Sequence, residues 1–544
     1  MTPPALTVIG LDAATFDVID PLLEAGELPA IGRLLANGAF GPLRSTTHPL
    51  TPLAWTTMTT GVNAGVHGVW DFTERDESGH HLRLVNGSFR RAPALWELLS
   101  ARGRTVGIAN VPFTWPASEV NGFLLSGLDA SARSDGAVFP SELAGELARR
   151  FGRLDLDHAF PLDGSGRVDL DIVRRAAEAR CAALAWLVER FQPELLFAVF
   201  MSADHIHHLA WPEWEERGAE SRVADVYRIL DGVVAVLCEL AGEDANVMLV
   251  SDHGGGSLAG VVNLNAWLAR EGFLTYADGM ADIRTEEGRR RLVHRLYKLQ
   301  RALPDAIRSR FRRRLPRLRD WALRRREYSV IDWPHTRAFS YGTFGNVVVN
   351  VRGREEFGVV EPDDYERLRS EIVERLHELR GPEGDRIVAA VHRREDLFAG
   401  ACLELLPDLV VEFENYAWLG KGALTYRTDD LWDEIAVDGS PESYVGSHRH
   451  DGVFALNGPA TRHGRVHARI EDVAPTVLYL LGEPVPPEFE GRVLTEAISE
   501  ELLDRRPPEY ADEADSVALA GRTTYTGEAV DEVEARLRSL GYVE

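Results

Sequence analysis

Short apolar runs alternate with longer amphipathic segments through the first half of the chain. Runs rich in Leu, Val, Ile and Phe predict buried strands at 6–11, 105–111, 195–200 and 247–250. Apolar residues at helical spacing between these runs predict helices at 20–37, 92–101, 140–151, 170–191 and 221–240. Strands and helices that alternate in this order are typical of an α/β fold with a mostly parallel sheet.

A strongly basic segment at 284–326 interrupts this alternation. It carries 17 Lys and Arg against 4 Asp and Glu, and its Leu, Phe and Trp residues recur at near-helical spacing. The pattern predicts two or three inserted helices with basic outer faces. They would form either a solvated cap on the core or a face that attracts an anionic substrate or an anionic surface.

The second half of the chain predicts further strands and a return to the core. Strand patterns resume at 339–351 and 387–392, and strands at 409–413 and 453–456 are expected to rejoin the core, followed by a helix at 470–481. We therefore expect a core in two parts, a mixed cap between them, and an acidic tail with a last helix at 530–540; these four regions are 1–265, 266–400, 401–498 and 499–544.

Composition and charge indicate where the protein is located and which partners are excluded. A net charge of −25 over 544 residues argues against nucleic acid as the main partner. Cys181, Cys238 and Cys402 lie in apolar surroundings, which predicts free thiols in a reducing compartment. The first residues resemble a core strand and not a signal peptide, and no stretch reaches the roughly 18 apolar residues of a spanning helix. We expect a cytoplasmic protein without a transmembrane segment.

The stretch 44–72, RSTTHPLTPLAWTTMTTGVNAGVHGVWDF, carries the first candidate chemistry. Thr51 followed by Pro52, with Gly61 nine residues further on, predicts a short helix with Thr51 as its N-cap. The N-terminus of a helix favours a phosphate group. The Thr51 hydroxyl could attack phosphorus if a base or a metal activated it. The alternative is that Thr51 only caps the helix.

Further polar residues follow the predicted core strands. An acid follows each of three predicted strands: Asp12, Asp204 and Asp252. His253 comes directly after Asp252, and His208 lies four residues after Asp204. His448 lies in the motif GSHRHDG, ahead of another predicted strand. In an open α/β sheet, ligands bind outside the carboxyl ends of the strands. Each pair alone is commonplace, but together with Thr51 they supply seven oxygen and nitrogen ligands, enough for two metal sites: Asp12, Thr51, Asp204, His208, Asp252, His253 and His448.

The order of these motifs resembles that of the alkaline phosphatase superfamily. It is most similar to the type I phosphodiesterase/nucleotide pyrophosphatase branch, including its AlkP-type phosphohydrolases or phosphomutases. The similarity extends to TPLAWTTMTTGVNAGVHGVWDF, ANVPFTWP, IDWPHTRAFSYG and DVAPTVLYLLGEPVPPEFEG, and so runs along nearly the whole chain. It implies an alkaline-phosphatase-like core, with a mostly parallel sheet flanked by helices and an inserted helical or mixed cap.

The resemblance also implies the cofactors and the role of each motif. Two divalent metal ions are expected, zinc in most of the superfamily, with manganese as the other possibility. One ion would bind Asp204, His208 and His448, and the other Asp12, Asp252 and His253. Thr51 would lie between the two ions and form a phosphothreonine intermediate.

Two departures from the family pattern affect the expected substrate. Where nucleotide pyrophosphatases carry an Asn three residues after the nucleophile, this chain has Ala54. Asn63 and Arg44 are possible replacements in substrate binding. Thr51 stands where sulfatases of the superfamily carry Cys or Ser, which disfavours a sulfatase.

The sequence thus predicts a hydrolase of small-molecule phosphate esters, acting on a phosphodiester or pyrophosphate bond. A phosphomutase or a phosphomonoesterase could use the same two-metal site. An alternative of another class is an anion- or membrane-surface-binding protein that uses the basic segment 284–326. The organic part of the ester and the oligomeric state stay open.

Overall fold

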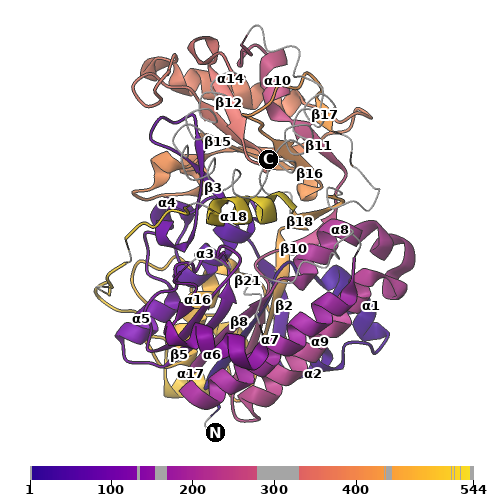
Figure 1. The fold of residues 1–544 in the computed structure, drawn as a ribbon, viewed down its shortest axis with the longest axis vertical. Helices are drawn as coiled ribbons and strands as arrows, with labels where there is room; N and C mark the ends of the chain where they lie inside the picture. Colours follow the sequence, from indigo (N-terminus) through magenta and orange to yellow (C-terminus); the bar gives the residue numbers. More distant parts are fainter. Residues whose placement is uncertain are drawn as a thin grey trace, which may run out of the picture.

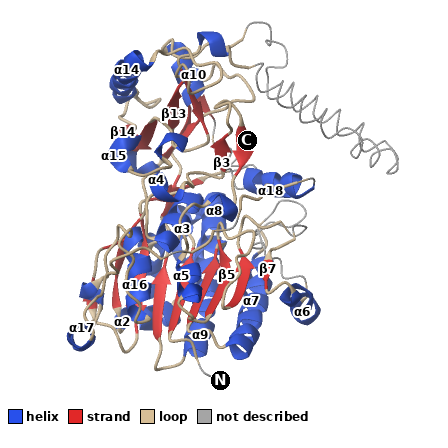
Figure 2. Ribbon diagram, turned by 90° about the vertical axis from the view of Figure 1, so that its left-hand side faces the viewer, coloured by secondary structure: helices blue, strands red, loops and turns tan. Residues whose placement is uncertain are grey.

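The computed structural model describes residues 3–131, 135–152, 168–277, 330–433, 435, 444–515, 517–519, 521–526 and 528–539. These residues form a larger lobe around one large sheet and a smaller lobe around a second sheet (Figures 1 and 2). The basic segment predicted as cap helices, 284–326, lies outside the described residues.

The large sheet has a parallel centre with one antiparallel strand on each side of it. Its central strands run in the order β9 (Asn246–Val250), β1 (Leu6–Leu11), β8 (Leu195–Phe200), β5 (Val106–Val111) and β6 (Gly122–Ser126), all of them parallel. Strands β19 and β7 flank this centre and are antiparallel to it. Strand β2 follows β19 and pairs with two short parallel strands, β20 and β21. The bounds of these strands are β7 (Val138–Phe139), β19 (Asp451–Asn457), β2 (Ala39–Arg44), β20 (Gly464–Arg465) and β21 (Ala468–Arg469). The predicted α/β class with a mostly parallel sheet is confirmed.

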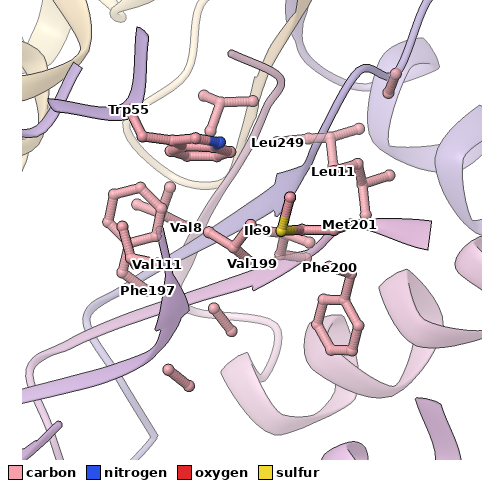
Figure 3. Packing of buried hydrophobic residues seen from close by; sticks show 14 of the residues in the cluster. Val8, Ile9, Leu11, Trp55, Val111, Phe197, Val199, Phe200, Met201 and Leu249 are labelled. Atoms are coloured by element: carbon pink, nitrogen blue, oxygen red, sulfur yellow. The ribbon is translucent and has the colours of Figure 1, made fainter. Parts of the chain in front are cut away.

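Strand β1 lies at the centre of the core because every one of its residues is buried. Gly10 lets the indole of Trp55 pack directly on this strand, since a Cβ at Gly10 would lie 2.6 Å from Trp55 Cη2 and 2.8 Å from Val199 Cγ2. Figure 3 shows Trp55 among the apolar side chains of β1, β8 and β9. The ring therefore reaches the end of β1, where Asp12 follows.

Two groups of helices flank the sheet (Figure 1). In one group α9 contacts both α2 and α7, and in the other α16 contacts both α3 and α5; their bounds are α2 (Pro29–Ala36), α7 (Leu170–Phe191), α9 (Arg222–Ala241), α3 (Thr51–Thr60), α5 (Leu95–Ala101) and α16 (Val473–Leu480). The remaining helices of this lobe are α1 (Phe16–Glu24), α4 (Ala64–His67), α6 (Glu142–Phe151), α8 (Ser202–Arg217) and α17 (Glu500–Arg505).

The single helix expected at 20–37 is wrong. Helix α1 ends at Glu24, Gly26 adopts a φ of 74°, and α2 starts with Pro29 as its first residue. A glycine in the left-handed region ends a helix, and a proline begins one readily. Apolar periodicity continues across this break because both helices pack on the same core. The helix expected at 170–191, in contrast, has those bounds as α7.

The smaller lobe contains an antiparallel sheet in the order β12 (Ala338–Tyr341), β13 (Asn346–Val349), β15 (Leu409–Phe413) and β14 (Val388–Arg393), with helices α10 (Leu264–Arg270), α14 (Tyr365–Glu378) and α15 (Arg394–Leu397). The strand expected at 339–351 is two strands, because Gly342 and Gly345, with φ of 72° and 88°, form the turn between them. The expected return to the core at 409–413 is also wrong, since β15 pairs with β13 and β14. The domain boundaries stay a prediction.

Short sheets complete the described structure. One pairs β10 (Gly254–Ser257) with β18 (Gly446–Arg449), and another pairs β3 (Thr73–Arg75) with β4 (Leu82–Leu84). The third has the order β16 (Trp418–Lys421), β11 (Gly260–Asn263) and β17 (Trp432–Asp433). The last helix, α18 (Glu528–Ser539), matches the one expected at 530–540 and lies where the two lobes meet (Figures 1 and 2). All three cysteines are free, as expected. Among the described helices, none combines the length and the apolarity needed to cross a bilayer.

Candidate active site

The structure brings together all seven residues that the sequence singles out. Strands and the elements that follow them at the carboxyl edge of the large sheet supply most of these residues, while α3 and β18 supply the others. Every one of the seven is at most 2% exposed: Asp12, Thr51, Asp204, His208, Asp252, His253 and His448.

The first group consists of Asp204, His208 and His448. Asp204 Oδ1 lies 3.0 Å from His208 Nε2 and 3.4 Å from His448 Nε2. The two imidazole Nε2 atoms lie 3.1 Å apart. Asp204 and His208 face the same side because they are four residues apart in α8, ahead of the kink at Ala210, where φ is −145°. One carboxylate and two imidazoles thus converge on one point.

The second group consists of Asp12, Asp252 and His253. His253 Nε2 lies 3.3 Å from Asp252 Oδ2 and 3.7 Å from Asp12 Oδ1. Ala13 adopts a φ of 60°, and its N–H donates to Asp252 Oδ1 at 3.4 Å. A residue other than glycine in this region is strained, and such strain is common at functional sites.

Thr51 lies beside this second group. Its Oγ1 is 3.4 Å from His253 Nε2. The expectation that Thr51 is the N-cap of its helix is wrong, because Leu50 is the N-cap and Thr51 is the first helical residue. The helix end at Gly61 is as expected, with a φ of 69°. The Thr51 side chain does not cap α3, so its hydroxyl is directed to the ligand groups.

All three histidines have their Nε2 atoms directed into the site by backbone carbonyls. His208 Nδ1 donates to Gly446 O at 3.1 Å, His253 Nδ1 to Gly254 O at 3.1 Å and His448 Nδ1 to Pro49 O at 2.6 Å. A carbonyl oxygen can only accept, so each neutral ring carries its proton on Nδ1 and a lone pair on Nε2. Imidazoles held in this way are ready to bind a metal ion.

The electrostatics of the site also favour cations. Burial, together with the charges of neighbouring aspartates, raises the pKa of Asp12 and Asp252 well above the usual range. Burial opposes ionisation of Asp204 too, but His208 and His448 lower its pKa well below the usual value. Burial lowers the pKa of His253 and His448, which keeps both imidazoles neutral.

The donor set fits divalent metal ions. Two sets of three ligand atoms lie within 4.8 Å of one another, one from Asp12, Asp252 and His253 and one from Asp204, His253 and His448. Among the described residues, Asp12 Oδ1 and Asp252 Oδ2 are buried without a hydrogen-bond donor. Buried carboxylate oxygens without donors are costly unless a cation neutralises them. Carboxylates and neutral imidazoles together suit zinc or manganese.

The two candidate substrate-binding residues lie apart from these groups. Arg44 and Asn63 both line a cavity of about 320 Å³ that also includes Phe398. Arg44 is half-exposed and lies 3.7 Å from Asp451, whereas Asn63 accepts from Gly65 N at 2.7 Å and so caps α4. Within the described part of the chain, neither side chain bonds to the seven residues.

The residues that orient these ligands were not predicted from the sequence. The indole N–H of Trp55 donates to Asp12 Oδ2 at 2.8 Å, a contact that no motif in the sequence predicts. The Tyr444 hydroxyl lies 3.1 Å from His208 Nε2. Pro49 and Gly446 contribute carbonyls, which no side-chain pattern reveals. The one signal in the sequence for such an orienting residue is that Tyr444 lies four residues before His448.

The large sheet and the two ligand groups at its edge define the class of this protein. Its fold is that of the alkaline phosphatase superfamily. The structure matches phosphonoacetate hydrolase from Sinorhizobium meliloti 1021 in complex with phosphonoformate, with a TM-score of 0.53 and 16% identity over 88% of this chain and 95% of that chain. It also matches murine ectonucleotide pyrophosphatase/phosphodiesterase 5, with a TM-score of 0.50 and 12% identity over 91% of this chain and 100% of that chain.

The family follows from the sequence. A sequence model of the type I phosphodiesterase / nucleotide pyrophosphatase family matches residues 6–429, and the chain belongs to that family. The predicted relationship is confirmed, and the protein is a hydrolase that acts on phosphoester bonds. A comparison with curated proteins found no match.

Proposed function

We propose that this protein hydrolyses the phosphodiester or pyrophosphate bond of a small-molecule ester, with Thr51 as the nucleophile. One observation carries the proposal: the Thr51 hydroxyl, 3.4 Å from His253 Nε2, is buried beside two groups of carboxylates and imidazoles. A hydroxyl in this position suits nucleophilic catalysis, because it is held at the point where the ligand groups converge.

Asp204, His208 and His448 would hold one divalent ion, and Asp12, Asp252 and His253 a second. Two such ions supply the positive charge that stabilises the attacking and the leaving oxygen of an in-line displacement. The mixture of imidazole and carboxylate ligands favours zinc, with manganese as the alternative.

The reaction would proceed in two displacements at phosphorus. In the first, Thr51 Oγ1 loses its proton and forms a bond to phosphorus, while the bond from phosphorus to the leaving oxygen breaks and that oxygen takes up a proton. In the second, water attacks the phosphothreonine, which releases phosphate or a phosphate monoester and restores the hydroxyl. Helix α3 begins at Thr51, so the backbone N–H groups of its first turn that lack a partner within the helix would face the phosphoryl oxygens of the ester.

The substrate is proposed only by class. Arg44 and Asn63 are candidates for contacts to its organic part, because both line the same cavity. The solved relatives suggest compounds to try: phosphonoacetate hydrolase is named for phosphonoacetate, and an inactive variant of the murine enzyme was solved in complex with AMP. The cytoplasm is the proposed location, which the three free cysteines support.

The test compares Thr51→Ala with Thr60→Ala. Both changes remove a buried threonine hydroxyl from α3, but Thr60 Oγ1 donates to Thr56 O at 2.7 Å, within the helix itself. Each variant is loaded with zinc or manganese, its metal content is measured, and hydrolysis of bis-p-nitrophenyl phosphate and p-nitrophenyl phosphate is followed. Thr51→Ala should lose activity while it keeps its metals, and Thr60→Ala should keep both. Full activity in metal-loaded Thr51→Ala would contradict the proposal.

Product analysis in ¹⁸O-water distinguishes hydrolysis from the phosphomutase alternative, because only hydrolysis introduces solvent oxygen. The surface-binding alternative predicts salt-dependent binding to anionic vesicles that survives Asp252→Asn. Its basic segment, 284–326, lies outside the described residues.

A further inference from the structure

Three consecutive residues at the start of β18 hold His208 from several sides: Tyr444 and Val445 precede the strand, and Gly446 is its first residue. Val445 N donates to the carbonyl of His208 at 2.8 Å, and His208 Nδ1 donates to Gly446 O at 3.1 Å. The phenol ring of Tyr444 stacks on the imidazole, with ring centroids 4.1 Å apart and planes tilted by 23°. The Tyr444 hydroxyl is thereby fixed at the metal-facing edge of His208.

This approach of two backbones requires a glycine. A Cβ at Gly446 would lie 2.2 Å from the carbonyl oxygen of His207. Strand β18 therefore lies directly against α8. This contact between backbones, and not a flexible side chain, sets the position of Tyr444. A ring stacked in this way has little freedom to move its hydroxyl elsewhere.

The hydroxyl has an acceptor in this structure that it would lose in the metal-loaded enzyme. Tyr444 OH lies 3.1 Å from His208 Nε2, and that atom carries the lone pair because Nδ1 is the donor. A metal ion bound to His208 uses the same lone pair. A phenol keeps its proton at neutral pH, so the hydroxyl needs a new acceptor.

A phosphoryl oxygen at the ligand groups is the acceptor that the proposed reaction supplies. It would carry negative charge and lie beside the metal-facing edge of His208, within reach of a hydroxyl fixed there. In α3, the three residues after Thr51 carry no side-chain donor, and the indole N–H of Trp55 is already bonded to Asp12. Donors for the phosphoryl oxygens must therefore come from the backbone or from other elements.

We infer that Tyr444 is a substrate-contacting residue whose hydroxyl donates a hydrogen bond to a non-bridging oxygen of the phosphoryl group. This inference rests on the proposed function. Tyr444 would add a hydrogen-bond donor to the seven predicted residues, and this donor belongs to the segment that also positions His208. A hydrogen bond to a charged oxygen of this kind changes binding by roughly ten- to a hundredfold.

The test is Tyr444→Phe, which keeps the ring that stacks on His208. Its control is Tyr479→Phe, which removes a tyrosine hydroxyl that donates to Arg506 O at 2.6 Å in another part of the lobe. Both changes are made in metal-loaded Thr51→Ala protein, and the affinity for inorganic phosphate and for orthovanadate is measured by calorimetry. Metal content and thermal unfolding are measured on the same samples.

Tyr444→Phe should weaken binding of both anions by about ten- to a hundredfold at unchanged metal content, and Tyr479→Phe should not. Unchanged anion affinity in Tyr444→Phe would overturn the inference. Loss of metal from Tyr444→Phe would also overturn it, because the hydroxyl would then act through His208. These measurements need no turnover, so a failure here is distinct from the failure of the proposed function, which an active Thr51→Ala enzyme would show.

Discussion

His208 Nε2 and His448 Nε2 face each other at 3.1 Å, although each ring donates from Nδ1 to a backbone carbonyl. No proton is therefore left to lie between the two nitrogens when both rings are neutral. Two lone pairs at this distance repel each other. A cation that accepts both of them removes the repulsion, and Asp204 contributes the charge that such a cation needs.

Metal removal should consequently destabilise the protein. A ligand present at about 100 times its dissociation constant adds about 2.7 kcal/mol to the free energy of unfolding. Chelation should thus lower the midpoint of thermal unfolding by several degrees, and zinc or manganese should restore it. Asp204→Asn, which removes a ligand of one of the two proposed ions, should reduce this metal-dependent shift.

The control for this prediction is Asp231→Asn. Asp231 accepts from Ile31 N at 2.8 Å and lies on α9, away from the ligand groups. This variant should unfold at a lower temperature but keep the shift between chelator and metal. Equal midpoints with and without metal in the unaltered protein would contradict the proposed metal sites.

Trp55 should affect metal affinity without touching a metal ion. Its indole N–H donates to Asp12 Oδ2 at 2.8 Å and so orients that carboxylate. Loss of such an orienting contact lowers metal affinity or activity by roughly ten- to a hundredfold. Trp55→Phe should show this decrease in a competition assay with a chromogenic chelator.

Trp96→Phe is the matched control. Trp96 is also buried, and its Nε1 has no hydrogen-bond partner in the described part of the chain. It should lose stability through packing, while its metal affinity stays that of the unaltered protein. An equal loss of metal affinity in both variants would show that packing, and not the hydrogen bond to Asp12, is responsible.

Asp71 should make stability depend on pH. Burial raises the pKa of Asp71 to about 7, whereas the unfolded chain has a value of about 3.9. The folded state then binds the proton more tightly, so this group lowers the free energy of unfolding as pH rises from about 4 to about 7.

Asp71→Asn removes the titration and can still accept from Phe72 N through its amide oxygen. Relative to the unaltered protein, the variant should gain about 2 to 3 kcal/mol in the free energy of unfolding between pH 5 and pH 8. Urea unfolding at both values measures this difference, and pH 5 serves as the reference. A difference between the two proteins that does not change with pH would contradict the raised pKa.

Arg44 should contribute to binding the organic part of the substrate. Arg44→Gln is expected to raise KM several-fold for an ester with a large organic group and to leave metal content unchanged. Arg462→Gln is the control, because Arg462 is a half-exposed arginine that pairs with Glu500 at 3.3 Å outside the cavity. If both variants have the KM of the unaltered protein, Arg44 has no role in substrate binding.

The sequence predicted the large sheet well because its central strands are buried on both faces and read as continuous apolar runs. It also placed Asp12 and Asp252 correctly, since residues that follow parallel strands meet at one edge. The break at Gly26 and the pairing of β15 were missed, because apolar periodicity reports burial and not the partner against which a segment packs.

The contacts that orient the ligands could not be predicted in the same way. The carbonyls of Pro49 and Gly446 accept from histidines 399 and 238 positions away along the chain. Every residue has a carbonyl, so nothing in the sequence distinguishes these two. The role of Trp55 depends on the absence of a side chain at Gly10, which becomes apparent only when the two segments are packed together.

The segment from Tyr444 to His448 joins the site from late in the chain. During synthesis the ribosome makes Asp12, Asp204 and Asp252 long before these residues emerge. A chain released early would thus carry the carboxylates of both groups but lack His448, the carbonyl of Gly446 and the stacked ring that hold His208. The proposed metal sites would therefore be complete only in full-length molecules, and prematurely terminated products would bind divalent ions weakly.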